Sequence, residues 1–139
     1  MRPPNWEFRL VAYAQGQIGR PFRWGETDCF SLARGALEVI LDADPLADVP
    51  TYADAGGARA VLAAYPDVGA EFERRGATRL PVAFAQQGDV LTLPGDDGTA
   101  LPRFGFVVDG RGRFMTSDPE RGVEILPIPD DATAWRWPA

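Results

Sequence analysis

The spacing of the apolar residues changes part-way along this chain, and that change constrains the fold more than any other feature. As far as about residue 76, apolar side chains recur every three to four positions, the spacing of an amphipathic helix. After about residue 82 they fall in short runs separated by glycine-containing turns, as β-strands do. Helices followed by an antiparallel sheet predict an α+β fold. We expect one domain over residues 1–139, with a helical half at about 5–76 and a sheet half at about 82–137.

Four segments of the first half have helical character. We expect helices over residues 6–17, 28–41, 55–65 and 67–76. Asn5 is the expected cap of the first helix, and Thr27 or Asp28 the expected cap of the second. Gly76 is the expected C′ residue of the fourth, where a left-handed conformation favours glycine. One face of the first helix carries its apolar side chains, namely Trp6, Leu10, Val11, Ala14 and Ile18.

The second half contains several short strands. We expect strands over residues 90–93, 104–108, 113–116, 122–128 and 134–137. Asp109 and Gly110 begin a turn that predicts a hairpin between the second and third of these. Pro127 marks a sheet edge or a strand end, because proline cannot donate a ladder hydrogen bond. The tryptophans Trp135 and Trp137 either close the core or stack the guanidinium of Arg136 for binding, and we favour the core.

The overall charge and the rare residues exclude several classes of function. The formal net charge is −6, which argues against a nucleic acid or an anionic membrane as the main partner. One cysteine and no histidine exclude an internal disulfide and an ordinary zinc site, and we expect no metal or other cofactor. No stretch is long and apolar enough for a membrane span, and the N-terminus lacks a signal-peptide core. We therefore expect a product that stays in the cytoplasm or leaves it within an assembly.

Cys29 is the candidate nucleophile, because it follows a Trp-Gly turn and a Thr-Asp pair at the start of a predicted helix. A helix N-terminus lowers the pKa of a thiol, which predicts an activated sulfur. A thiol nucleophile also needs a base within hydrogen-bond reach, and this chain has no imidazole. Asp28 or Asp89 could replace it only with a strongly raised pKa. The alternative is that Cys29 is simply a small buried hydrophobic residue.

Three segments together resemble a known family: Gly19-Arg20-Pro21-Phe22-Arg23-Trp24-Gly25-Glu26-Thr27-Asp28-Cys29, Gly88-Asp89-Val90, and Arg103-Phe104-Gly105-Phe106-Val107-Val108. The sequence resembles the NlpC family of papain-fold cell-wall peptidases over roughly residues 15–126. More narrowly, the cysteine segment and the closing Ala134-Trp135-Arg136 look like the branch encoded among tail-tip genes of phages, prophages and gene transfer agents. The resemblance implies a papain-like fold with helices packed on an antiparallel sheet.

The resemblance also implies roles for single residues. Cys29 matches the nucleophile and Asp28 the acidic residue before it, while Arg103 stands where the family has its catalytic histidine. Thr116 or Ser117 takes the position that orients the base. Arg103 cannot act as a base, because a guanidinium stays protonated, although it could pair with a Cys29 thiolate or with Asp28. Loss of general acid–base help costs about 10²–10⁴-fold in rate.

These implications favour a catalytically silent, structural component of a phage or phage-like tail tip or baseplate hub. Its partners would be hub, distal-tail and tape-measure proteins, and it would be made in the host cytoplasm and reside in the virion. The alternative is an active cysteine endopeptidase that opens peptidoglycan cross-links during genome entry, with a base from a neighbouring subunit or from Asp28. A third possibility is a cytoplasmic bacterial protein of prophage origin with a regulatory role.

Overall fold

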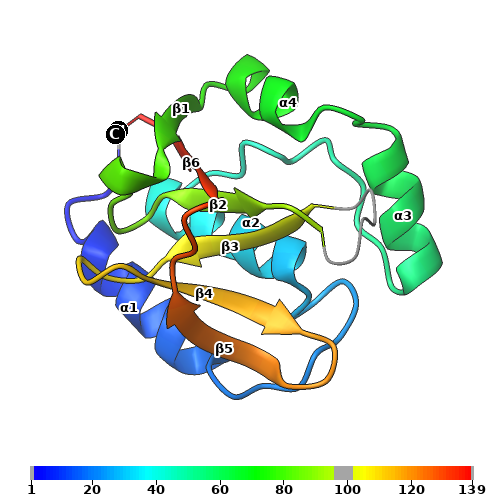
Figure 1. The fold of residues 1–139 in the computed structure, drawn as a ribbon, viewed down its shortest axis with the longest axis horizontal. Coiled ribbons are helices and arrows are strands. Elements are labelled where there is room, and N and C mark those ends of the chain that lie inside the picture. Colours follow the sequence, from blue (N-terminus) through cyan, green and yellow to red (C-terminus); the bar gives the residue numbers. More distant parts are fainter. Residues whose placement is uncertain (1, 96–101, 139) are drawn as a thin grey trace.

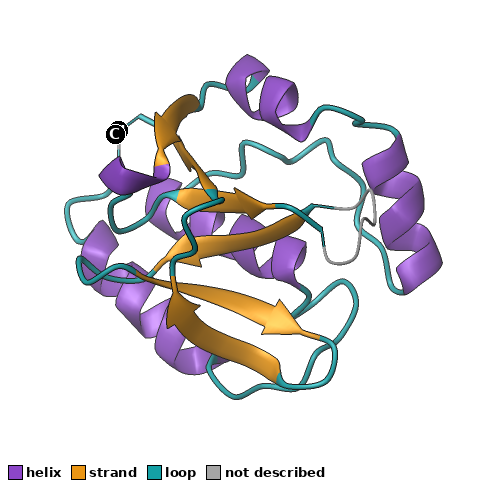
Figure 2. Cartoon of the chain, viewed as in Figure 1, coloured by secondary structure: helices purple, strands orange, loops and turns teal. Residues whose placement is uncertain are grey.

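The computed structural model describes residues 2–95 and 102–138. Within these residues the chain forms helices first and then mainly strands, which confirms the predicted α+β class. Figures 1 and 2 show α1 and α2 stacked behind the sheet, with α3 beyond one end of its strands and α4 next to β1 at the upper edge of the sheet. The helices are α1 (Trp6–Gln17), α2 (Cys29–Leu41), α3 (Ala55–Ala63) and α4 (Val68–Arg74), with a 3-10 turn, η1 (Val82–Phe84). The strands are β1 (Thr78–Pro81), β2 (Val90–Leu93), β3 (Arg103–Val107), β4 (Arg113–Asp118), β5 (Gly122–Pro127) and β6 (Thr133–Arg136).

Local sequence signals account for most helix boundaries. Asp28, Asp54 and Asp67 each cap a helix by accepting a backbone N–H in the first turn. Gly76 follows α4 with φ of +101°, as predicted for a C′ residue. Asn5 is the N-cap residue of α1, as predicted, but its side chain makes no capping hydrogen bond. Nearby, the backbone N–H of Trp6 donates to the carbonyl of Pro3 at 3.1 Å.

The central helix α2 supplies much of the core, because its apolar residues recur at helical spacing on the side facing the sheet. Leu32, Leu37 and Ile40 are almost completely buried. Burial of a side chain of this size contributes about 1.5–3 kcal/mol. In α1, by contrast, Leu10 and Ala14 are buried, while Val11 is exposed. The apolar face predicted for α1 is therefore only partly buried in the core.

The described strands form one antiparallel sheet in the order β1-β6-β2-β3-β4-β5. The predicted hairpin is present as β3 and β4, with Phe106 opposite Met115. Pro127 ends β5 at the sheet edge, as predicted. The strand β1 was not expected; it pairs with β6 at the other edge, so the sheet begins before residue 82.

The last strand lies between β1 and β2 rather than at an edge. To reach it, the connection after β5 crosses the sheet on the side away from α1 and α2 (Figure 1). That side of the sheet carries a second, smaller apolar cluster of Leu91, Val107, Phe114 and Ala134, against which Ile128 of the connection packs. Both faces of the central strands are thus buried, which explains their nearly continuous apolar character.

The tryptophans at the C-terminal end belong to the core, as favoured from the sequence. Trp135 and Trp137 are each only 4% exposed. Both make edge-on contacts with the ring of Phe72 in α4, at centroid distances of 5.7 and 5.2 Å. Arg136 lies between them in the sequence but does not stack on either ring; it pairs with Asp89. Burial of these rings joins α4 to the sheet.

Across residues 2–95 and 102–138, none of the helices has both the length and the apolar character that a membrane crossing requires.

Candidate functional site

A tight turn before α2 positions the sequence-predicted nucleophile. The carbonyl of Arg23 accepts hydrogen bonds from the N–H groups of Glu26, Thr27 and Asp28. Thr27 is fully buried, and its hydroxyl donates to the carbonyl of Pro21 at 2.7 Å while accepting from the N–H of Arg23 at 2.8 Å. These hydrogen bonds fix the turn from within. Cys29 consequently occupies the first position of α2.

Gly25 is required in this turn for two reasons. Its φ of +81° lies in the left-handed region, and a Cβ there would collide with the carbonyl oxygen of Tyr52. The Trp-Gly pair therefore allows two chain segments to approach each other closely.

Asp28 caps α2 and is almost completely buried, with 2% of its surface exposed. One carboxylate oxygen accepts from the N–H of Gly25 at 2.8 Å, and the other accepts from the N–H of Ser31 and the hydroxyl of Tyr52. Both oxygens are therefore engaged in holding the turn. The Tyr52 hydroxyl remains protonated, because burial and its hydrogen bond to Asp28 raise its pKa well above the usual range.

Cys29 is half-buried and borders a cavity of about 350 Å³. Burial raises the pKa of its thiol to about 11, and the charge of Asp28 acts in the same direction. Hydrogen bonds from the backbone of Phe104 and Phe30 and the charge of Arg103 lower it only in part. The prediction of a lowered pKa is therefore wrong, because desolvation outweighs the effect of the helix N-terminus. The thiol is neutral at physiological pH.

Arg103 is the first residue of β3 and lines the same cavity as Cys29. The structure thus brings together the predicted nucleophile and the arginine that the resemblance sets at the histidine position. Its positive charge favours the thiolate of Cys29 and helps to lower the pKa of Asp118. A guanidinium beside a thiol provides electrostatic attraction but accepts no proton.

The two residues proposed for the orienting position behave differently. Thr116 is completely buried and donates its hydroxyl hydrogen to the carbonyl of Phe104 at 2.8 Å. It is absent from the residues that line the Cys29 cavity in the described part of the chain. Ser117 lines that cavity and is 3% exposed, and its hydroxyl has no hydrogen-bond partner among the described residues. Successive strand residues face opposite sides, so Ser117 is the member of the pair on the Cys29 side.

Asp89 lies outside this cavity and has a different role. It is completely buried, and its two carboxylate oxygens accept from Nε and a terminal nitrogen of Arg136, each at 2.8 Å. It also accepts from the N–H of Gln86 at 2.8 Å. The Gly-Asp pair of the resemblance therefore fastens the start of β2 to β6. Sequence analysis did not identify Arg136 as its partner, because the two residues are far apart in the chain.

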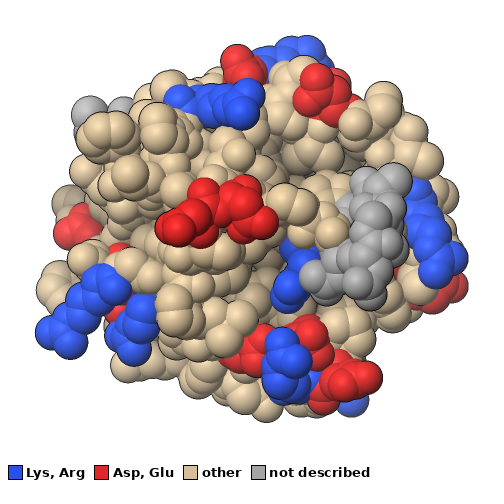
Figure 3. All heavy atoms as spheres, in the orientation of Figure 1, with Lys and Arg blue, Asp and Glu red and all other residues tan. Residues whose placement is uncertain are grey.

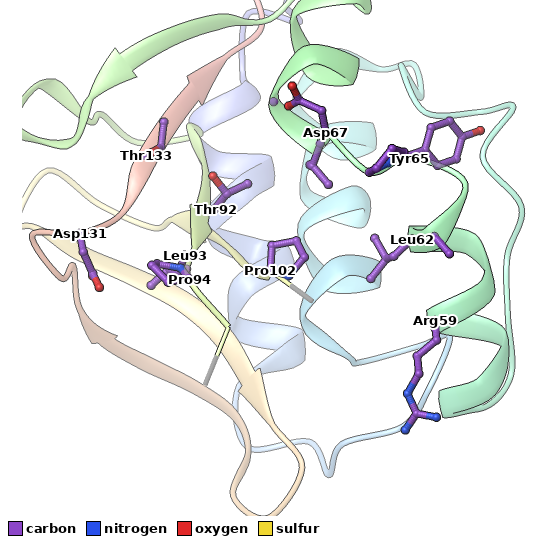
Figure 4. Close-up of a pocket in the computed structure, with 14 residues that line it drawn as sticks. Arg59, Leu62, Tyr65, Asp67, Thr92, Leu93, Pro94, Pro102, Asp131 and Thr133 are labelled. Atoms are coloured by element: carbon purple, nitrogen blue, oxygen red, sulfur yellow. The ribbon is translucent and has the colours of Figure 1, made fainter. Parts of the chain in front are cut away.

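A larger cleft of about 1120 Å³ lies beside the Cys29 cavity and was not expected from the sequence. Figure 4 shows Arg59, Leu62 and Tyr65 on its α3 side, with Thr92 and Leu93 of β2 facing them. Leu62 and Pro102 line both hollows. No motif predicts this cleft, because its walls come from α3, the start of α4, β2 and the approach to β6.

The described residues contain no cluster of three or more His, Cys, Asp or Glu side chains that could hold a metal ion. On the face drawn in Figure 3, acidic and arginine side chains lie in separate small groups of both signs. This pattern differs from the continuous basic stripe typical of nucleic-acid-binding surfaces.

Comparison with known proteins places the sequence in a family without assigning it an activity. No curated protein matches the sequence. Residues 1–137 match a family described as a domain of unknown function, DUF6950. The match covers nearly the whole chain, including the Cys29 turn, the sheet and the C-terminal tryptophans. The chain therefore belongs to the DUF6950 family.

Proposed function

We propose that this chain is a catalytically silent relative of the NlpC-type papain-fold peptidases and serves as a structural component of a phage or phage-like tail tip. One observation carries the proposal: the side chain that lines the Cys29 cavity from the start of β3 is Arg103, which cannot accept a proton. The fold and the thiol remain, while the proton-handling group is replaced by a fixed cation.

The arrangement of elements supports the papain-like part of the proposal. Cys29 is the first residue of α2, and Arg103 is the first residue of β3. The helix α2 packs against β3. The next strand, β4, contributes Ser117 to the same cavity. A nucleophile on a helix start, facing residues from two adjacent antiparallel strands, is the order of parts that the resemblance to NlpC peptidases implies.

The chemistry around Cys29 supports a silent site. The ionisable residues lining its cavity in the described structure are Asp28, Tyr52 and Arg103, besides Cys29 itself. Asp28 already accepts three hydrogen bonds, and Tyr52 and Arg103 are both protonated. None of them is arranged to take the thiol proton and return it to a leaving amine. Such help contributes about 10²–10⁴-fold to a rate.

Exposed apolar side chains support a role in an assembly. Phe8 is 79% exposed and Val11, one turn later in α1, is 41% exposed. Phe84 in η1 is 66% exposed. Contiguous apolar patches on a surface mark contacts with other proteins, and Phe8 and Val11 lie about one turn apart on the same helix. With the resemblance to the tail-gene branch, they point to hub, distal-tail or tape-measure proteins as partners and to the virion as location.

Two measurements test the proposal. The purified protein and its Cys29→Ala variant should release no cleaved peptide from muropeptides, and cysteine-dependent cleavage would refute the silent site. The Arg103→His variant should gain cysteine-dependent cleavage, whereas Arg111→His in an exposed turn should not.

Particles assembled with a tagged chain should contain it in fixed stoichiometry, unchanged by Cys29→Ala. Its absence from purified particles would refute the structural role.

A further inference from the structure

The cavity beside Cys29 is enriched in aromatic side chains. Aromatic residues make up 11% of the sequence but five of the thirteen described residues that line this cavity. These five are Phe22, Trp24, Phe30, Tyr52 and Phe104. The volume of about 350 Å³ lies within the range of small-molecule pockets, about 300–1,000 Å³. The proposed structural role does not by itself require such a hollow.

The rings that line the cavity are already arranged in edge-to-face pairs. The ring planes of Phe22 and Trp24 are 88° apart, with 4.8 Å between their centroids, and Trp24 contacts Tyr52 at 6.4 Å. Phe30 and Phe104 form a second pair at 5.0 Å. Aromatic rings attract one another in this geometry at centroid distances of about 4.5–7 Å. Because these rings come from the turn before α2, from α2 itself and from β3, a further ring in the cavity would meet aromatic surface from several segments.

The polar groups in the wall of the cavity offer little to a charged ligand. Asp28 is 2% exposed and already accepts three hydrogen bonds, one of them from Tyr52. The hydroxyl oxygen of Ser117 has almost no accessible surface. Arg103 is itself engaged, and its charge is matched by that of Asp28 in the same wall. A charged ligand would therefore lose its hydration without gaining an open partner, whereas a neutral ring would lose little.

We propose that the Cys29 cavity binds an uncharged aromatic ring of about the size of indole. An apolar cavity of about 150 Å³ takes up benzene, so a volume of about 350 Å³ has room for two fused rings. Trp24, which is 38% exposed, would contact the bound ring from the turn before α2, and Leu62 would contact it from α3. The inference does not rest on the silent peptidase site, because it uses neither the base nor the thiolate.

Two sources offer this chemistry, a free small molecule and an aromatic side chain of another protein. The probes are indole and the uncharged N-acetyl-tryptophanamide, and their charged counterparts are indole-3-acetate and tryptamine. Indole should cause saturable backbone NMR shifts at Gly25 and Phe30, with a Kd of about 0.1–1 mM. Both charged compounds should bind at least about tenfold more weakly. Tighter binding of N-acetyl-tryptophanamide than of indole would identify a protein side chain as the source, and binding of indole alone a small molecule.

Variants and a second readout locate the bound ring. Trp24→Ala should weaken indole binding about three- to tenfold, because one edge-to-face contact is lost. Leu62→Trp should abolish binding by filling the cavity from α3, and it keeps the test open if Trp24→Ala does not fold. Phe84→Ala is the matched control, since it removes a ring that is 66% exposed in η1 and should bind normally. Saturating indole should also slow the alkylation of Cys29 at pH 10 at least about threefold, because the thiol borders the cavity.

Any of three results would overturn the proposal: no saturable shifts at the cavity, binding of indole-3-acetate or tryptamine as tight as that of indole, or normal binding by folded Leu62→Trp. These results are independent of the muropeptide assay, so the ring-binding cavity and the silent peptidase fold can fail separately.

Discussion

The ion pair between Asp89 and Arg136 offers the sharpest test of how this fold is held together. The Asp89 side chain is 1% exposed and that of Arg136 is 31% exposed. Breaking a buried pair by removing one partner costs about 3–5 kcal/mol, because a buried charge is left without compensation. In Asp89→Ala the remaining arginine can still reach water, so we expect the lower end, about 3 kcal/mol. In Arg136→Ala the carboxylate stays buried without its guanidinium partner and keeps only the hydrogen bond from the N–H of Gln86, so we expect about 4–5 kcal/mol.

The unequal cost of the two variants is the informative quantity. Guanidinium chloride unfolding, followed by circular dichroism and tryptophan fluorescence, would give both free energies of unfolding. For a chain of this size, 3 kcal/mol corresponds to a fall in Tm of about 10 °C. The double variant should lose less than the sum of the two single losses, because no buried charge remains.

The matched control is Arg74→Ala, which removes an exposed pair with Glu71. The side chains of that pair are 63% and 28% exposed, so we expect a much smaller loss of stability than for either buried-pair variant. If Arg136→Ala proved no costlier than Arg74→Ala, or cheaper than Asp89→Ala, the reasoning from buried charge would be refuted.

Three further predictions concern the site and the sheet. Because burial raises the pKa of Cys29 to about 11, alkylation by iodoacetamide should be slow at pH 7 and accelerate towards pH 11. The contribution of the neutral Cys29 thiol to the free energy of unfolding should be fully present below about pH 9 and should disappear as the pH rises through 11. Fast alkylation at pH 7 would contradict both expectations. Gly105→Ala should cost about 1–3 kcal/mol, since a Cβ there would lie 2.5 Å from the ring of Phe114, and an unchanged unfolding midpoint would disprove that close contact. Tyr52→Phe should cost about 1–3 kcal/mol by removing the donor to buried Asp28, and unaltered thermal stability would exclude a structural role for that hydrogen bond.

The residues around Cys29 fall into two groups, those that hold the turn before α2 and those that line the cavity. The side chains of Asp28 and Thr27 stabilise the turn, and their polar atoms already form hydrogen bonds with neighbouring groups. Arg103 and Ser117 line the cavity itself. Substitution of the first pair should therefore affect folding, whereas substitution of the second should change the charge or polarity of the cavity wall.

Much of the fold could be predicted from the sequence because it depends on neighbouring residues. A cap at Thr27 or Asp28, the glycine after α4 and the hairpin of β3 and β4 were all predicted, and the structure has the cap at Asp28. Each rests on a side-chain or backbone preference that acts over a few positions. The strand β1 was missed, since its four residues carry a weak alternating pattern and are mostly exposed.

The candidate site was only partly predictable for a related reason. The resemblance directed attention to Cys29 and Arg103, and the structure places both at one cavity. It left Thr116 and Ser117 as alternatives, and only the orientation of β4 distinguishes them. No sequence motif predicted the larger cleft, because the residues that line it come from several segments between residues 59 and 133.

The sequence alone determined the class of fold, a helix over about residues 28–41 and the absence of an imidazole base. Composition and the spacing of apolar residues can be read from the order of residues without knowing how distant segments pack. The tertiary structure decided three further features. It set β6 between β1 and β2, it paired Asp89 with Arg136, and it raised the thiol pKa instead of lowering it. Each depends on burial among residues distant in the chain, and desolvation is a property of the packed molecule rather than of any short segment.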